Sequence, residues 1–287
     1  MKTSTRLRFT ALTLAMILAA PAAHAAVVTA NDPSGDAFTN PSSSNQGQAI
    51  GDSGWYYNNV RAGATVGIDT AYPRSGNGSV SFSSPQGGKA DVEFLPNALP
   101  FSGNYASTAS LGAFSVLTSM SYDWYRDASS TATSRLHPSL RVLLDRDGNL
   151  ATTGDRGGLV FERTYNNLTT PVDQWVSDAV SATTKVWNFG LGIGNEADIN
   201  GNGYAYDSSL SDWQAYMPTA AVIGFSSGVG SGWQPFDGAV DNISWTLNGV
   251  TTTTNFEVAP SDVPEPASLG LIAIGLAGLA LRKRASR

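Results

Sequence analysis

Residues 116–124 read Val-Leu-Thr-Ser-Met-Ser-Tyr-Asp-Trp, and this stretch decides the fold class. Mostly large side chains recur at every second position: Val116, Thr118, Met120, Tyr122 and Trp124. Small or charged side chains take the positions between them: Ser119, Ser121 and Asp123. Because successive side chains of a strand point to opposite faces of a sheet, this alternation predicts a β-strand with one face in the core and one in water.

The same alternation recurs along the rest of the chain. It predicts further strands at 79–82, 90–94, 140–144, 159–162, 221–226, 240–247 and 251–258. The turn residues from Asp145 to Asn149 and the Gly157-Gly158 pair indicate a hairpin with a long loop, and Asn248-Gly249 is a favoured two-residue hairpin turn. Residues 173–186 fit a helix and a strand or loop equally well.

Many short strands joined by turns, without an internal repeat, predict an all-β fold of two antiparallel layers. We expect this sandwich to have jelly-roll topology and to span residues 55–260. The segment 26–54 is rich in Asn, Ser, Pro and Gly and is predicted to be an irregular lead-in. The chain contains no Cys, so core packing must hold the fold without disulfides.

The first segment, residues 1–25, has the features of a secretory signal peptide. Basic residues at positions 2, 6 and 8 precede an apolar run from Phe9 to Ala20. Ala23-His24-Ala25 then gives a small-x-small cleavage pattern. The sequence therefore predicts export, with the mature chain beginning near Ala26.

The last segment, residues 261–287, contains a second signal. Pro264-Glu265-Pro266 precedes an apolar run from Leu269 to Leu281, and Arg282-Lys283-Arg284 follows it. A helix over that run would be about 20 Å long, shorter than the roughly 30 Å hydrocarbon core of a bilayer. The basic cluster would stay cytoplasmic, which places everything before the run on the far side of the membrane. The two prolines keep the backbone around Glu265 extended.

This tail resembles the PEP-CTERM sorting signal of Gram-negative bacteria. The resemblance implies an exosortase-type membrane protease as processing partner, transient insertion of the tail into the inner membrane, and a final location at the cell surface or in the extracellular matrix. An ordinary C-terminal anchor after a Pro-rich linker is the alternative. The body resembles the β-sandwich domains that commonly precede this tail and, more distantly, carbohydrate-binding jelly rolls, in Tyr165-Asn166, Trp175, 230–233, 236–242 and 255–257.

The exported part of the chain is acidic. Seven of the 17 Lys and Arg residues lie in the two terminal signals, so residues 26–266 carry ten basic and 23 acidic residues, a formal net charge of −13. Such a surface repels nucleic acid and anionic lipid and favours divalent cations. We therefore expect no nucleic-acid partner.

Few catalytic designs fit the composition. His137 is the only His after the signal peptide, and without a Gly-x-Ser-x-Gly pattern we expect it to lie in a surface loop. The residues for thiol chemistry and for the usual catalytic zinc sites are absent, as are phosphate-binding motifs. Glycoside hydrolysis needs only two carboxyl groups. Asp91 and Glu93 on one strand face, with Glu162 on another strand, could supply them, although solvated strand faces are the simpler interpretation.

Four residues of one loop have a spacing that suits calcium: Asp198, Asn200, Asn202 and Asp207. The first three place oxygens at positions 1, 3 and 5, and Gly203 follows at position 6, as in the first half of an EF-hand loop. Position 12 is Ser209 in place of the usual Glu. The same residues also suit an ordinary Asn/Gly turn. Calcium is the one cofactor that the sequence indicates, with Asp237 and Asp241 as a weaker second site.

All seven Trp residues lie in the exported part. Exposed aromatic rings can stack on sugar faces, and Trp55, Trp213 and Trp233 lie in Gly-, Ser- and Asp-rich surroundings that are typical of loops, although a place in the core is the simpler interpretation for any one of them. Trp124 and Trp245 lie in predicted strands and are expected in the core. The sequence thus favours a non-enzymatic surface or matrix protein that binds exopolysaccharide weakly. A glycoside-active enzyme on the same sandwich is the alternative.

Overall fold

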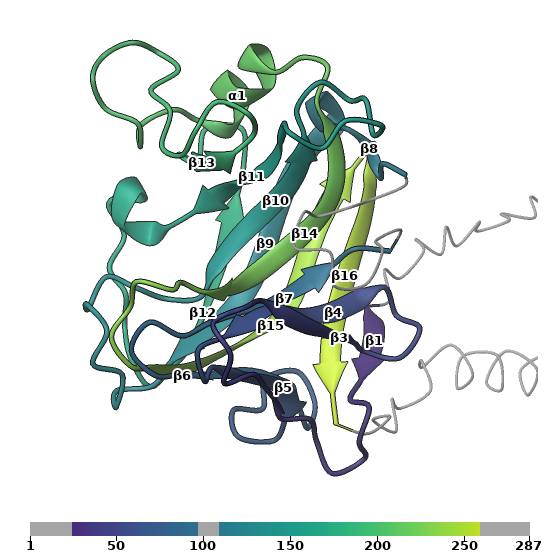
Figure 1. The fold of residues 1–287 in the computed structure, drawn as a ribbon, viewed down its shortest axis with the longest axis vertical. Coiled ribbons are helices and arrows are strands. Elements are labelled where there is room, and N and C mark those ends of the chain that lie inside the picture. The colour runs from purple at the N-terminus through teal and green to yellow at the C-terminus, as the bar shows by residue number, and fades with distance from the viewer. Residues whose placement is uncertain (1–24, 97–108, 259–287) are drawn as a thin grey trace, which may run out of the picture.

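A computed structural model describes residues 25–96 and 109–258, which form two β-sheets of eight strands each (Figure 1). The predicted signal peptide, apart from Ala25, and the predicted sorting tail lie outside the described residues. Within those two ranges the structure contains no helix whose length and apolar character would let it span a bilayer.

The first sheet is organised around its longest strand, β15 (Phe236–Leu247). Strand β9 (Leu117–Arg126) lies along one edge of β15, whereas β6 (Ser79–Ser84) pairs with its first half and β16 (Val250–Glu257) with its second. The sheet is completed by β1 (Ala26–Thr29), β2 (Phe38–Thr39), β5 (Thr65–Asp69) and β12 (Trp175–Val180). Its pairs are antiparallel except for β1 with β16.

The second sheet has the order β13-β11-β10-β14-β7-β4-β3, and β8 also pairs with β14. Its pairs are all antiparallel. The bounds are β3 (Gln46–Ala49), β4 (Trp55–Arg61), β7 (Lys89–Phe94), β8 (Gly112–Ala113), β10 (Ser139–Asp145), β11 (Arg156–Phe161), β13 (Trp187–Gly190) and β14 (Ala221–Val229).

The described part of the chain contains one α-helix, α1 (Leu210–Tyr216), and two short 3-10 helices, η1 (Phe114–Val116) and η2 (Arg163–Asn166). Ser209 caps the start of α1: its side chain accepts the Asp212 backbone N–H while the Asp212 side chain accepts the Ser209 backbone N–H. This reciprocal cap satisfies two backbone donors that a helix start otherwise leaves unpaired. So short a helix has no periodic apolar pattern in the sequence.

Aromatic side chains join the two sheets in the core. Trp55 of the second sheet lies 6.2 Å from Trp245 and 5.0 Å from Phe256 of the first, measured between ring centroids. Phe225 of the second sheet stacks on Trp245 at 4.2 Å. Burial of rings this large supplies much of the apolar area that stabilises the sandwich, at roughly 25 cal/mol per Å² removed from water. The predicted all-β, two-layer sandwich is confirmed, and its jelly-roll topology stays a prediction.

Strand β9 follows the predicted alternation over most of its length. Met120, Tyr122 and Trp124 are buried, as predicted, but Asp123, predicted to face water, is also buried and accepts hydrogen bonds from Arg74 and Ser177. At the start of the strand Leu117 is buried and Thr118 is exposed, which reverses the prediction there. The pairing with β15 shifts register near Leu247, and this irregularity explains the reversal. Val116 belongs to the 3-10 helix that precedes the strand.

The prediction of an irregular lead-in at 26–54 is wrong. Strand β1 adds to the first sheet beside β16, β2 pairs with β5, and β3 pairs with β4 in the second sheet. Between them, Asp36 accepts hydrogen bonds from the Tyr57 hydroxyl at 2.6 Å and from two backbone N–H groups. The lead-in is therefore part of the sandwich. Residues 173–186, whose sequence fits a helix and a strand or loop equally well, contain the strand β12.

Candidate functional site

A pocket of about 340 Å³ opens on the second sheet, on the face that turns away from the core. Strand β10 has one face toward the core and one toward the pocket. Leu140, Val142 and Leu144 pack in the core, whereas Ser139 and Arg141 line the pocket. Strands β7, β11 and β13 and two loops complete the lining with Lys89, Val160, Glu162, Trp187, Phe189, Asn195, Glu196, Gly230, Ser231 and Trp233. We call it the ring-lined pocket.

Three aromatic rings line this pocket: Trp187, Phe189 and Trp233. The half-buried Trp233 is held by an edge-on contact with Phe236, at 5.4 Å between ring centroids. It also packs closely over Gly230, where a Cβ would come within 2.7 Å of the indole nitrogen. Glycine is thus required at position 230 for this placement of the ring.

The aromatic surface continues past the pocket. Trp187 contacts Tyr206 edge-on at 6.0 Å, and Tyr206 stacks on Tyr165 at 4.1 Å. Tyr204, half exposed, lies 5.5 Å from Tyr206. These rings extend the aromatic wall from Trp187 toward the loop before α1, so a ligand longer than the pocket would find further rings beside it.

Buried charges lie next to the pocket on β7. Asp91 is paired with Arg141 at 2.6 Å and with Lys89 at 3.2 Å. The Asn59 side-chain amide donates to Asp91 at 3.0 Å and to Glu93 at 3.2 Å, so the two carboxyl groups are neighbours as predicted. Both side chains are fully buried, and the interpretation of this strand face as solvated is therefore wrong.

Burial and charge act differently on these two acids. Burial would raise the pKa of Asp91, but the Arg141 and Lys89 charges and the hydrogen bonds together hold it below its usual value. Burial raises the pKa of Glu93, and the neighbouring Asp91 charge raises it further. Glu93 therefore takes up a proton at a higher pH than Asp91 does. Asp91 holds Arg141 in position, and neither carboxyl group has an exposed oxygen.

Two other carboxyl groups face the pocket. Glu162 follows β11 and is half-buried, and burial raises its pKa while the Arg141 and Arg135 charges oppose that shift. Glu196 is exposed, and its backbone N–H donates to Asn188 O at 2.8 Å. The sequence pattern indicates Glu162 as a candidate acid but does not indicate Glu196. Trp187 and Phe189 also have no local signal, because β13 reaches the pocket only by pairing with β11.

The prediction that Trp55 and Trp213 lie in loops as sugar-stacking rings is wrong. Trp55 begins β4 and is buried in the aromatic core, because the Gly and Ser before it form the turn that leads into the strand. Trp213 is buried in α1, where its indole N–H donates to Val186 O at 2.9 Å. Trp233 alone of the three lies at the pocket. Trp124 and Trp245 are in the core, as predicted.

The prediction that His137 lies in a surface loop is wrong, because its side chain is buried and the residue is only 2% exposed. Its ring stacks on Trp124 at 4.7 Å, and its Nε2 accepts the Arg163 backbone N–H at 3.1 Å. Its Nδ1 lies 2.9 Å from Pro138 O and 3.0 Å from the Tyr122 hydroxyl. The pattern assigns the ring proton to Nδ1 and makes His137 a neutral core residue.

The loop predicted to bind calcium does bring its four residues together. The Asp198 carboxylate accepts backbone N–H groups of residues 201, 202 and 203, and Asp207 accepts the side-chain amides of Asn200 at 2.9 Å and of Asn202 at 2.6 Å. These contacts are those of an Asn/Gly turn. Calcium binding here stays a prediction. At the second predicted site, the buried Asp241 accepts backbone N–H groups of Ser75, Asn242 and Phe256.

The comparisons with known proteins identify the tail. A family model described as the PEP-CTERM protein-sorting motif matches residues 262–285. The chain therefore carries this sorting signal, which indicates export and supports an exosortase as processing partner. The sorting residues Pro264, Glu265 and Pro266 lie in the matched range, outside the described residues. No curated protein matches the chain in sequence.

Two solved structures resemble the chain at low similarity. A beta-1,2-glucanase from Parabacteroides distasonis is 10% identical with a TM-score of 0.33, over 78% of this chain and 24% of that one. The chain thus spans about a quarter of the glucanase. TmCBM61, solved with beta-1,4-galactotriose, is 9% identical with a TM-score of 0.25, over 68% of this chain and 86% of that one. Likeness at this level carries no argument about function.

Proposed function

We propose that this exported protein is a non-enzymatic surface or matrix protein that binds polysaccharide through the ring-lined pocket. The observation that carries the proposal is the combination of three rings with hydrogen-bonding side chains in one pocket. Sugar rings have apolar faces that pack on aromatic side chains, and their hydroxyls need polar partners at the edges. Trp187, Phe189 and Trp233 supply the rings, and Asn195, Ser231 and Glu196 are among the polar groups.

The buried acids argue against the catalytic pair that the sequence offered. A glycoside hydrolase needs two carboxyl groups that reach the scissile bond. Asp91 and Glu93 have no exposed surface and are engaged with Arg141, Lys89 and Asn59. Their role in this proposal is to hold one wall of a binding pocket.

A glycoside-active enzyme is the second candidate, and one observation favours it. Glu162 and Glu196 line the same pocket in different environments, since Glu162 is half-buried with a raised pKa and Glu196 is exposed. In such enzymes the environments of two carboxyl groups set their pKa values apart, so that one acts as the general acid and the other as the base. Activity, if present, would depend on these two side chains.

Retention on polysaccharide isolated from the producing organism tests the binding proposal. We expect Trp233→Ala and Trp187→Ala to weaken the apparent affinity at least about tenfold, which corresponds to about 1.4 kcal/mol. Tyr216→Ala is the matched control, because Tyr216 is an exposed ring on α1 that does not line the pocket. Unchanged retention of folded Trp233 and Trp187 variants would contradict the proposal.

Release of new reducing ends from the same polysaccharide separates the two candidates. A binding protein leaves the polymer intact, so wild type, Glu162→Gln and Glu196→Gln should all release none. Turnover by wild type that both substitutions abolish would establish the enzyme instead.

A further inference from the structure

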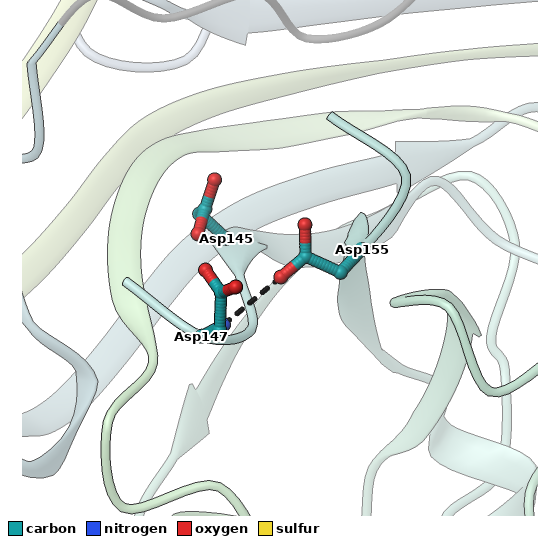
Figure 2. A group of neighbouring side chains, drawn as sticks. All are labelled: Asp145, Asp147 and Asp155. Carbon is teal, nitrogen blue, oxygen red and sulfur yellow. Dashed lines mark hydrogen bonds between the residues drawn. The ribbon is translucent and has the colours of Figure 1, made fainter. Parts of the chain in front are cut away.

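A second group of polar side chains lies away from the ring-lined pocket, in the loop that joins β10 to β11. Asp145 ends β10, Asp155 immediately precedes β11, and Asp147 lies in the loop between them. The Asp147 backbone N–H donates to the Asp155 carboxylate at 3.0 Å, which ties the two ends of the loop together. Figure 2 shows the three carboxylates gathered around one space.

The spacing of these carboxylates suits one hard cation. One oxygen from each residue can be chosen so that all three lie within 4.8 Å of one another. Calcium binds oxygen at about 2.3–2.6 Å, so two ligands on opposite sides of the ion are about 5 Å apart, and one calcium ion can reach all three. Magnesium at about 2.0–2.1 Å would require a tighter set.

A separate observation points to a missing partner. Asp145 is fully buried, and its Oδ1 has no hydrogen-bond partner anywhere in the described ranges. Its other oxygen, Oδ2, is paired with Arg156 Nε at 3.2 Å. A buried carboxylate oxygen without a donor or a cation is costly, by about 1–3 kcal/mol or more for a charged group. The loop therefore has an unsatisfied acceptor beside two more carboxylates.

We propose that Asp145, Asp147 and Asp155 bind one calcium ion that closes the loop between β10 and β11. The Arg156 guanidinium balances one of the three negative charges and is also tied to the loop through Leu150 O at 2.9 Å, so two charges remain for a divalent cation. The ion would supply the partner that Asp145 Oδ1 lacks. Bound there, it would fix the start of β11 against the end of β10.

This site differs from the Asp198 loop in whether its carboxylate oxygens already have hydrogen-bond partners. In that loop the Asp207 oxygens are occupied by the amides of Asn200 and Asn202, and the Asp198 oxygens by backbone N–H groups. At the β10–β11 loop the buried oxygen of Asp145 is unpaired within the described residues. The two loops can be tested against each other in one experiment.

Calorimetric titration of the metal-free full chain with CaCl₂ tests the proposal. We expect one ion per chain and a melting temperature that rises by several degrees in calcium and falls again with chelator, because the ion binds the folded state. Asp147→Asn and Asp155→Asn should each weaken binding at least tenfold. Asp198→Asn is the matched control and should bind like wild type.

Several outcomes would overturn it: no heat of binding and no melting shift in wild type at millimolar calcium, binding that survives Asp147→Asn combined with Asp155→Asn, or binding lost in Asp198→Asn. Magnesium bound as tightly as calcium would overturn the choice of ion. Asp147 is exposed, so its substitution leaves the core intact, and circular dichroism checks that each variant is folded.

Discussion

At the scale of single residues, His137 is a buried polar side chain with a partner on each ring nitrogen. The Arg163 N–H donates to its Nε2, so a proton on that nitrogen would face another donor. Burial lowers the pKa of His137 to about 4, despite the favourable contact of Nδ1 with Pro138 O. The sequence could not show this, because the Ser- and Thr-rich approach to His137 is typical of a loop and its partners lie elsewhere in the chain.

This environment predicts a pH-dependent loss of stability. The folded-state pKa lies below the unfolded value of about 6.5, so the unfolded chain binds the proton first on acidification. The contribution of neutral His137 to the free energy of unfolding is therefore fully present above pH 6.5, and it is lost as the pH falls to about 4. A shift of this size corresponds to roughly 3 kcal/mol.

Urea unfolding at several pH values measures this effect, with His137→Gln as the comparison. The variant should be less stable than wild type at pH 7, and the gap should shrink as the pH falls toward 4. The difference in stability between wild type and variant is the quantity to follow. Buried acids such as Asp241, whose pKa burial raises to about 7, change stability with pH in the opposite direction, but they do so equally in both proteins. A gap that does not change with pH would show that His137 does not titrate in this way.

At the scale of elements, the Asn248-Gly249 turn between β15 and β16 is confirmed. Both residues have left-handed backbone angles, with φ of 51° at Asn248 and 74° at Gly249. Such angles match the twist of two antiparallel strands, and a side chain disfavours them. No other atom lies within 4 Å of where a Cβ of residue 249 would be. A substitution at this position therefore measures the cost of the left-handed backbone without a steric clash.

We expect Gly249→Ala to lower the free energy of unfolding by about 1–2 kcal/mol. Gly232→Ala is the matched control, because position 232 is equally open but does not have a left-handed φ, so it should change stability by less than about 0.5 kcal/mol. Denaturant unfolding of both variants measures the difference. Equal effects of the two substitutions would mean that turn geometry is not the cause.

The strands of the sandwich show which elements a sequence can predict. Strands that place large apolar side chains in the core at every second position, such as β9 and β10, were predicted well. The short strands β1, β2 and β3 were missed because they are held by backbone pairing with β16, β5 and β4, and two to four residues are too few to show an alternating pattern.

The pocket was less predictable than the strands. Its rings come from β13 and from the loop after β14, which meet only through long-range pairing of β13 with β11 and β14 with β10. Local composition is a poor guide to exposure for the same reason. Trp55 and Trp233 have similar Gly- and Ser-rich neighbours, yet Trp55 is in the core and Trp233 lines the pocket.

At the scale of the whole molecule, the sorting motif at one end of the chain indicates an exported protein. The sorting motif at residues 262–285 follows directly on a sandwich that needs no disulfide, and the exported part is strongly acidic. The chain from β1 to β16 forms both sheets, so removal of the segments outside it leaves the described core complete. Processing at the tail is therefore compatible with a folded product.

This arrangement predicts how the tail is handled in cells that contain the processing enzyme. If Pro264-Glu265-Pro266 is a recognition site, the surface form should lack Arg282-Lys283-Arg284, and Glu265→Ala should leave an unprocessed precursor in the inner membrane. A simple anchor predicts the opposite, because Glu265 lies outside the apolar run and would not affect insertion. Ser261→Ala is the control, since it lies just before the matched range. Intact-mass analysis of the surface form decides between them, and a surface protein that still ends at Arg287 would refute processing.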